Sequence, residues 1–328
     1  MNQSNIFRTE ISIIPPVHKF SLQSRILTAG SCFAEVMGNK MAAYKVPSLI
    51  NPFGTIFNPL SLFKLLAAAL HPQQPFTGEL LQRDKLWFVY DLHSSFAAPT
   101  KEQLLSKIQE TLEATHAFLK EANCLILTFG TAVGYVHKAS NTLVANCHKV
   151  PQQQFEKKLI SITDLLATFG SFYANLQKLN PNVTILVTVS PVRHLKETLE
   201  FNSVSKALLR VACHEIATQY PEVHYFPAYE LMLDDLRDYR FYKADMIHPT
   251  EVAETYIWQK FKEAYYDAAF QQFTTEWDKI QQALAHKPFH PELPAHQQFL
   301  QNLLAKVKQL HQIIDCTPEL EKIKMQLI

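Results

Sequence analysis

Continuous runs of apolar residues alternate along this chain with stretches of helical periodicity. Runs beginning at Ile26, Cys124 and Val183 predict strands covered on both faces, and shorter strands are expected over 86–92 and 223–226. Helical patterns are expected over residues 32–45, 60–70, 100–121, 154–179 with a bend near Gly170, and 203–220. This alternation predicts a three-layer α/β/α sandwich with a mainly parallel sheet.

The second half of the chain adds a hairpin and a helical tail. Residues 135–137 and 142–145 predict a hairpin, and a helix is expected from the loop at 242–250 to about Phe270. The rest is expected to be helical with an interruption at the prolines near 288–294, and its apolar stripe is Phe299, Leu303, Val307, Leu310 and Ile314. We therefore expect an α/β domain over 1–270, with its core at about 20–270. A helical extension over 271–328 would pack on this domain or on a second copy, as a homodimer.

The break at Gly30 predicts a strand-to-helix turn that carries Ser31 and Cys32. At a helix N-terminus, free backbone N–H groups and the helix dipole favour negative charge. A hydroxyl or thiol placed there can attack a carbonyl, and the N–H groups can receive an oxyanion. The alternative is that Ser31 only caps the helix and Cys32 fills space.

Polar residues gather where predicted strands end. These are His93, Thr131, Arg193 and His194, together with His148 after the hairpin. Ligands of parallel α/β sheets bind beyond the carboxyl ends of the strands. A constrained loop with two Asn-Pro steps adds Asn51, Gly54 and Asn58 to the candidates.

Asp245 and His248 form a second candidate pair. An Asp three residues before a His can reach the imidazole within one turn, fix its tautomer and stabilise the imidazolium. The pair precedes a proline and a predicted helix, and it follows the last predicted strand.

Composition narrows the class of protein. The net charge is +1 and no apolar run reaches the ~18 residues of a membrane span, so we expect neither nucleic-acid nor membrane binding. The first residues lack the pattern of a signal peptide, and five scattered cysteines predict free thiols, so a cytoplasmic protein is expected. No metal-ligand spacing is present, and neither a metal nor a cofactor is predicted. Seven glycines make up only about 2% of the chain, so we expect each to stand where the backbone conformation requires glycine.

The five residues from Gly30 to Ala34 spell GSCFA, and the chain resembles the GSCFA domain family. A strand, this turn and a helix at the start, with D-x-x-H-P near the end, also resemble the wider SGNH/GDSL hydrolase superfamily over about residues 20–270. The resemblance implies an SGNH-hydrolase-like, flavodoxin-like fold. In register, Cys32 takes the place of the nucleophilic Ser and Ser31 that of the intervening Asp, while Asp245 and His248 match their counterparts.

The resemblance also implies an oxyanion hole, with Gly54 and Gly130 as candidate donors. Ala132 stands where a G-x-N motif would have Asn. Losing one oxyanion donor costs ~10²–10³ in turnover, so Asn51, Asn58 or His194 would have to replace it.

The sequence therefore predicts an acyl-transfer enzyme, an esterase or acyltransferase acting on a small-molecule or carbohydrate ester. Cys32 or Ser31 would be the nucleophile, His248 the base and Asp245 its orienter. Asn51, Asn58, His93, Thr131, His148, Arg193 and His194 are candidates for substrate binding. Two other functions stay open: a non-catalytic ligand-binding module, and an interaction protein that assembles through its tail.

Overall fold

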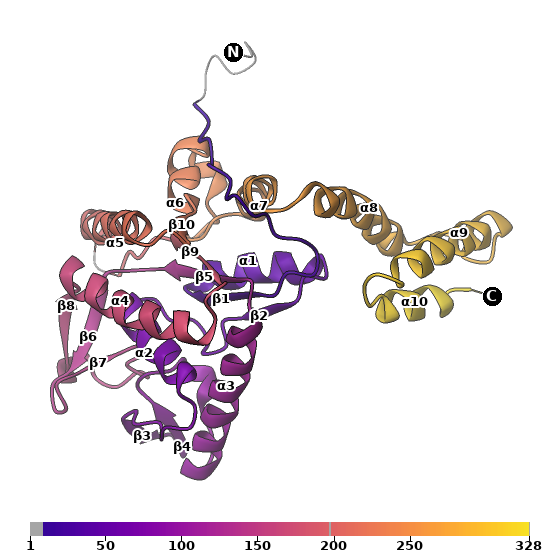
Figure 1. The fold of residues 1–328 in the computed structure, drawn as a ribbon. Coiled ribbons are helices and arrows are strands. Elements are labelled where there is room, and N and C mark those ends of the chain that lie inside the picture. The colour runs from indigo at the N-terminus through magenta and orange to yellow at the C-terminus, as the bar shows by residue number, and fades with distance from the viewer. Residues whose placement is uncertain (1–8, 197, 328) are drawn as a thin grey trace.

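A five-stranded parallel sheet forms the centre of the computed structural model, which describes residues 9–196 and 198–327 (Figure 1). The strands are β1 (Ile26–Gly30), β2 (Ser48–Ile50), β5 (Cys124–Phe129), β9 (Thr184–Val189) and β10 (Val223–Tyr225). Their spatial order is β2-β1-β5-β9-β10, and every pairing is parallel. Counted along the chain this is the order 2-1-3-4-5, the flavodoxin-like arrangement, whose switch point lies between β1 and β5.

Helices cover both faces of this sheet, as the three-layer prediction requires. One face carries α2 (Pro59–Leu70), α3 (Lys101–Glu121), α4 (Ile162–Leu179) and α5 (Leu199–Gln219). The other carries α1 (Cys32–Ala43), α6 (Ala228–Glu230), the π-helical turn η4 (Leu231–Asp235) and α7 (Glu251–Tyr265). Alternate strand residues feed the two cores: Leu27 faces the first and Ile26 the second. The predicted fold class is confirmed.

Two small antiparallel sheets flank the main one, and they correct two predictions. β3 (Leu80–Arg83) pairs with β4 (Leu86–Val89), so the predicted strand at 86–92 lies outside the parallel sheet. The hairpin of β6 (Val133–His137) and β7 (Thr142–Val144) is confirmed. Residues 155–159, predicted as helix, form a third strand, β8 (Phe155–Leu159), on β6. Their charged positions are exposed and only Phe155 is buried, because β8 is an edge strand.

Caps decide where the helices begin and end. Ser161 caps α4, which then runs through Gly170 as one uninterrupted helix. Thr198 caps α5, so this helix begins at Leu199, four residues before the predicted start at 203. The predicted helix to Phe270 is in fact two helices, since α7 ends at Tyr265 and Asp267 caps the next. Short 3-10 turns are η2 (Ser94–Phe96), η3 (Gln152–Gln154) and η5 (Tyr239–Phe241).

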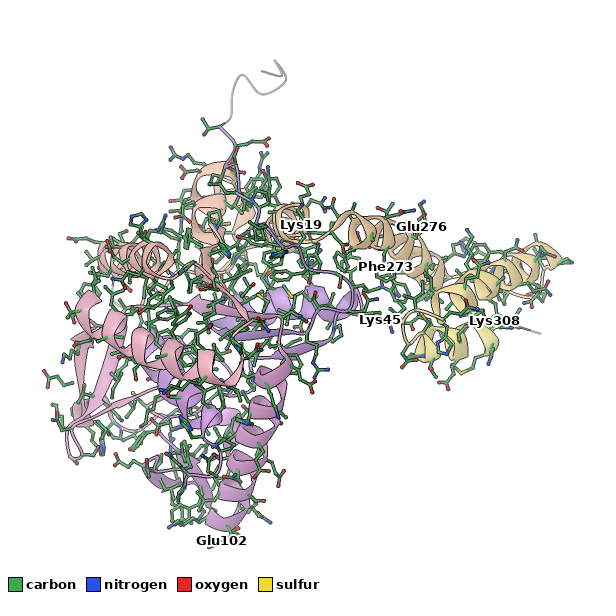
Figure 2. The ribbon with its side chains drawn as sticks, in the orientation of Figure 1. Lys19, Lys45, Glu102, Phe273, Glu276 and Lys308 are labelled. Carbon is green, nitrogen blue, oxygen red and sulfur yellow. The ribbon has the colours of Figure 1, made fainter. Side chains whose placement is uncertain are left out.

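The C-terminal helices α8 (Ala268–Ala285), α9 (Pro294–Leu310) and α10 (Thr317–Lys324) extend from the α/β body as an arm (Figure 1). They share a small apolar core that includes Trp277, Leu303 and Val307. The arm is held to the end of α1: Trp277 Nε1 donates to the Ala43 carbonyl at 2.8 Å, and Lys45 Nζ lies 2.9 Å from a Glu319 carboxylate oxygen. Figure 2 labels Lys45 where the α/β body meets the arm. The tail thus packs on the main domain in a single chain, while the domain division and the homodimer stay predictions.

No helix within the described ranges is long and apolar enough to cross a membrane.

Candidate active site

The turn at the end of β1 depends on a glycine. Gly30 has φ +131°, and a Cβ on it would lie 2.1 Å from the Thr128 carbonyl oxygen of β5. Only glycine fits this close approach. The Ser31 N–H then donates to the same carbonyl oxygen at 2.9 Å, which places the start of α1 over the β1–β5 switch point.

Ser31 and Cys32 occupy different environments in this turn. Ser31 is the N-cap of α1; its Oγ accepts the Phe33 N–H at 3.3 Å, and the residue is completely buried. Cys32 is the first residue of the helix and is half-buried. The hydroxyl is therefore engaged as a cap, whereas the thiol retains access from outside.

Opposing effects act on the acidity of the Cys32 thiol. Burial is the largest of these effects, and the net result is that the pKa of the thiol is raised. The backbone N–H groups of Cys32 and Phe33 and the positive charge of Lys206 act the other way, because each stabilises the thiolate.

Asn51 fastens the following loop to this turn. Its Oδ1 accepts the Gly30 N–H at 2.9 Å, and its Nδ2 donates to the Ser31 carbonyl at 3.4 Å. Asn51 has φ +41° and is buried, so this amide holds the turn and does not face an open cleft.

The two predicted oxyanion glycines have no N–H group to spare. The Gly54 N–H donates to the Asn51 carbonyl at 2.8 Å, and the Gly130 N–H donates to the Phe57 carbonyl at 2.9 Å. Gly54 is required for packing instead, since a Cβ on it would lie 2.4 Å from the Cβ of His93. In this structure the Gly54 and Gly130 donors are already paired within the backbone, contrary to the role expected of them.

Three other predicted substrate-binding residues stabilise local structure. Asn58 caps α2, with Oδ1 accepting the Ser61 N–H at 2.9 Å. His93 caps η2. His148 is buried, and its Nε2 lies 2.8 Å from the Val89 carbonyl oxygen. Each of the three therefore has a structural explanation.

Asp245 and His248 form the pair that the sequence predicts. The Asp245 Oδ2 lies 2.7 Å from His248 Nδ1, while Oδ1 accepts the backbone N–H groups of Ile247 and His248 at 2.8 and 3.0 Å. These hydrogen bonds hold the pKa of the Asp245 carboxyl well below its usual range. The arrangement leaves Nε2 of His248 to face solvent or a substrate, and the two side chains are 43% and 44% exposed.

The loop after β9 joins this pair to the sheet. The Arg193 N–H donates to the Ile247 carbonyl at 3.2 Å, and its guanidinium lies 3.9 Å from the centre of the Tyr242 ring. Arg193 thus anchors the Asp245–His248 turn and places His194 next to it.

His194 carries an unpaired polar atom at the switch point. Within the described chain its Nε2 is buried and has no hydrogen-bond partner, and its ring lies 5.0 Å edge-to-face from Phe57. A Cβ on Gly130 would approach Nε2 to 3.1 Å. Burial, and then the charges of Lys206 and His248, lower the pKa of His194 to about 3, so its imidazole is neutral at pH 7.

Lys206 is the functional candidate that sequence reasoning missed. It lies on α5, is 1% exposed, and its Nζ donates at 2.7 Å to the carbonyls of Gly130 and Ser190, at the ends of β5 and β9. Burial lowers its pKa to about 7, and the neighbouring Cys32 thiol acts in the opposite direction. A lysine on a predicted amphipathic helix gives no signal that it will be buried.

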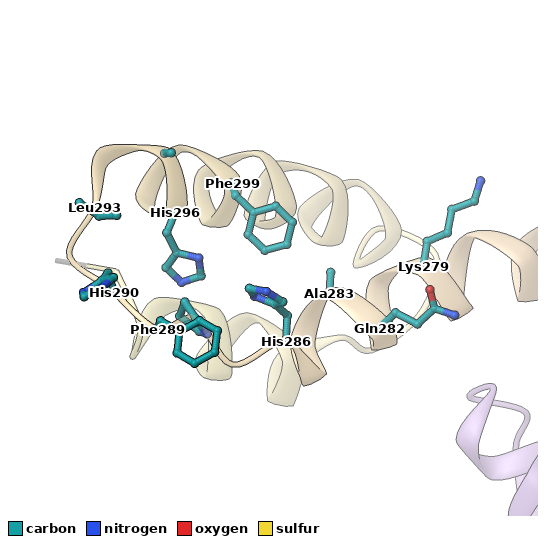
Figure 3. A pocket seen from close by; sticks show the side chains of 11 residues that line it. Lys279, Gln282, Ala283, His286, Phe289, His290, Leu293, His296 and Phe299 are labelled. Atoms are coloured by element: carbon teal, nitrogen blue, oxygen red, sulfur yellow. The ribbon is translucent and has the colours of Figure 1, made fainter.

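Two cavities bear on where a ligand binds. One of about 230 Å³ adjoins His194 and is also lined by Asn58 and Thr131, so it gathers three of the predicted substrate-binding residues. A second, of about 730 Å³, lies in the arm, where the rings of His286, His296 and Phe299 face the same space (Figure 3).

Within residues 9–196 and 198–327, no hydrogen bond joins the Cys32 thiol to His248. Nor does this part of the chain contain a group of three or more His, Cys, Asp or Glu side chains that could hold a metal ion.

Comparison with known proteins identifies the family. The model of the GSCFA family matches residues 25–261. The chain belongs to the GSCFA family. A further model, described as the GSCFA domain protein C-terminal domain, matches residues 277–328 of this GSCFA protein, which cover most of the arm. The predicted family is confirmed.

Comparisons beyond the family give little. No curated protein matches this GSCFA protein. Among solved structures, it is similar to a carbohydrate esterase family 2 enzyme with a carbohydrate-binding domain from Corynascus thermopiles (Myceliophthora fergusii). The identity is 14% and the TM-score is 0.29; the match covers 46% of this chain and 38% of that one, less than two thirds of its length.

Proposed function

We propose that this protein is an acyl-transfer enzyme, an esterase or acyltransferase, with Cys32 as nucleophile. The thiol sulfur attacks the acyl carbonyl as its proton passes to His248 Nε2. The carbon–oxygen bond to the leaving alcohol then breaks, and His248 returns the proton to that oxygen. Water or an acceptor hydroxyl gives its proton to His248 and attacks the thioester carbonyl. The carbon–sulfur bond then breaks, and His248 returns the proton to the Cys32 sulfur.

The observation that carries this proposal is the position of the thiol. Cys32 is the first residue of a helix at the switch point of a parallel sheet, and an oriented Asp245–His248 pair lies on a loop anchored to the neighbouring strand end. The nucleophile comes from one element, while the base and its orienter lie on another, and acyl-transfer triads on unrelated folds are recognised by such geometry and roles rather than by sequence position.

Two donors near the turn are suited to the developing oxyanion. The backbone N–H of Cys32 lies at the helix N-terminus, where it already stabilises negative charge on the thiol. The neutral imidazole of His194 can supply a second hydrogen bond from its unpaired Nε2. A neutral imidazole polarising a carbonyl has precedent in triosephosphate isomerase.

Hydrolysis of p-nitrophenyl acetate, with burst-phase detection and intact-protein mass, tests the proposal. We expect Cys32→Ala to abolish the burst and the acyl adduct, and His248→Ala to slow turnover by ~10² or more. Ser31→Ala removes only a cap, at ~1 kcal/mol of stability, and keeps the adduct. Cys147→Ala, which removes another half-buried thiol, is the matched control. An adduct that survives Cys32→Ala would refute the assignment.

A second candidate function is a non-catalytic ligand-binding module on the same fold. The paired N–H groups of Gly54 and Gly130 and the missing hydrogen bond between Cys32 and His248 in the described chain favour it. Its signature is ligand binding near His194 together with equal, slow ester hydrolysis by wild type and Cys32→Ala.

A further inference from the structure

The cavity beside His194 has aromatic and aliphatic walls. It lies between the first turns of α5, which contribute Phe201, and the β6–β7 hairpin, which contributes Val133 and Val144. Phe57 closes it on the side of Gly130, because the Phe57 carbonyl accepts the Gly130 N–H. The cavity therefore begins where the proposed oxyanion donor lies and extends away under the hairpin.

Most polar groups of the cavity wall already have partners. Thr131 Oγ1 and Ser205 Oγ are 3.0 Å apart, and Ser205 Oγ also accepts the Ala132 N–H at 2.7 Å. Asn58 is engaged with Ser61. These groups stabilise the cavity wall, and their hydrogen bonds to one another leave little capacity for binding a ligand.

Besides the unpaired Nε2 of His194, the exceptions are Lys196 and Asn202. Lys196 is exposed, its Nζ lies 5.1 Å from the centre of the Tyr135 ring, and no carboxylate in the described chain forms an ion pair with it. Asn202 uses Oδ1 to accept the His194 N–H at 2.9 Å, while its Nδ2 donates to no described residue. Among the described residues, the twelve that line the cavity include no acidic side chain. The remaining polar groups are donors, and they suit a carboxylate.

The two sides of the proposed reaction centre differ in access. His248, which protonates the leaving group, is 43% exposed, so the leaving alcohol can be large and can extend into solvent. The cavity of about 230 Å³ is small, roughly the volume of eight water molecules in the liquid. This asymmetry assigns the acyl group to the cavity.

We propose that the cavity binds the acyl group of the substrate and that Lys196 recognises a carboxylate at its far end. The substrate class is then a half-ester of a short dicarboxylic acid. The inference rests on the proposed acyl-transfer function and adds to it the identity of the acyl group.

The test compares p-nitrophenyl esters that share one leaving group. Mono-p-nitrophenyl glutarate and p-nitrophenyl pentanoate match in chain length and differ in the terminal carboxylate. We expect wild type to prefer glutarate in kcat/KM by roughly fivefold, the effect of one partly exposed ion pair. Lys196→Met should bring the ratio close to one, and Lys196→Glu should favour pentanoate. Added salt should weaken the wild-type preference.

Lys138→Met is the matched control, because Lys138 is an exposed lysine just beyond β6 that does not line the cavity. It should leave the ratio unchanged. The length of the acyl chain gives a second readout: turnover should fall between hexanoate and decanoate esters if the cavity bounds the chain. Equal rates for glutarate and pentanoate in wild type, or a preference that survives Lys196→Glu, would overturn the proposal.

Binding separates this inference from the proposed chemistry. Calorimetry on Cys32→Ala with glutaric acid monoamide and pentanamide examines the cavity without turnover. If the charged amide binds more tightly than pentanamide and Lys196→Met loses this preference, the cavity assignment is supported even when no ester is hydrolysed. The absence of hydrolysis would then refute only the proposed acyl-transfer function. Turnover without any preference for the charged ligand, in kinetics or in binding, refutes the cavity assignment alone.

Discussion

Replacing Lys206 by Met removes a buried ammonium group that acts on the thiol of the proposed nucleophile. The side chains have similar length, so the change deletes the ammonium group and its two 2.7 Å hydrogen bonds to the Gly130 and Ser190 carbonyls. Lys206 is among the groups that lower the pKa of the Cys32 thiol, so its loss should raise that pKa.

The size of the effect can be estimated. At an effective dielectric constant of ~20, a unit charge even ~10 Å away contributes roughly 1.7 kcal/mol, which is more than ~1 pKa unit. Because the pKa of Lys206 is about 7, its charge is present mainly below that pH, so the thiolate fraction and the alkylation rate at pH ~6.5 should fall by roughly 10-fold, and the difference should fade as the pH rises. The fold should tolerate the change. Two lost hydrogen bonds from a charged donor cost ~1.5–3 kcal/mol each. The shift of the Lys206 pKa from 10.5 to about 7 corresponds to roughly 5 kcal/mol against the buried charge, which Met relieves.

The assay is the pH dependence of iodoacetamide alkylation at Cys32, followed by peptide mass mapping. Lys262→Met is the matched control, since Lys262 is also buried but donates to Thr274 Oγ1 in a different part of the fold. We expect the Cys32 alkylation rate at pH ~6.5, where Lys206 is mostly charged, to fall by roughly 10-fold in Lys206→Met, with little change above pH ~9, and to stay unchanged in Lys262→Met. Identical alkylation rates at pH ~6.5 in wild type and Lys206→Met would show that Lys206 only ties the two strand ends together.

Three further predictions concern stability. Because the pKa of Lys206 is about 7 in the native state and 10.5 when unfolded, the unfolded chain binds more protons between these pH values. As the pH rises through this range, the free energy of unfolding of wild type should increase by up to ~1.4 kcal/mol per pH unit relative to Lys206→Met. Parallel pH profiles of the two proteins in urea titrations would contradict this. The pKa of His194 is lowered from 6.5 to about 3, so the unfolded chain binds more protons between these values as well. Wild type should therefore lose stability as the pH falls through that range, and His194→Gln should lose less. Gly30→Ala, which would place Cβ 2.1 Å from the Thr128 oxygen, should cost several kcal/mol; a cost below ~1 kcal/mol by the same titration would mean that the turn can move.

The main sheet was predictable because its signal is local. Buried parallel strands need continuous apolar runs, and those at Cys124 and Thr184 stand out from the helical patterns around them. The strand at 155–159 was missed because its one buried residue, Phe155, gives no alternation, and its pairing with β6 is a long-range choice. The strand at β4 was predicted, but no local pattern tells a strand of the main sheet from one in a separate hairpin.

The Asp245–His248 pair was also predictable from a local pattern, whereas the oxyanion donors were not. Asp245 and His248 are three residues apart, so their hydrogen bond depends on one turn. Whether the Gly54 or Gly130 N–H is free depends on the partners those groups find, Asn51 and Phe57 in this fold, and a motif does not specify them.

The residues that most change the view of the site, His194 and Lys206, carry no motif at all. Each is a polar group that the fold buries without a carboxylate partner in the described chain, which costs stability. Packing does not require either cost, because an apolar side chain could fill the same space. Lys206 acts on both His194 and Cys32, and the effects of the two buried residues are complementary: His194 is a neutral donor available for an oxyanion, and Lys206 in its protonated form favours the thiolate. The stability lost by burying His194 and Lys206 at these strand ends is better explained by a role in the proposed reaction than by a requirement of packing. The alkylation profile of Lys206→Met tests that explanation directly.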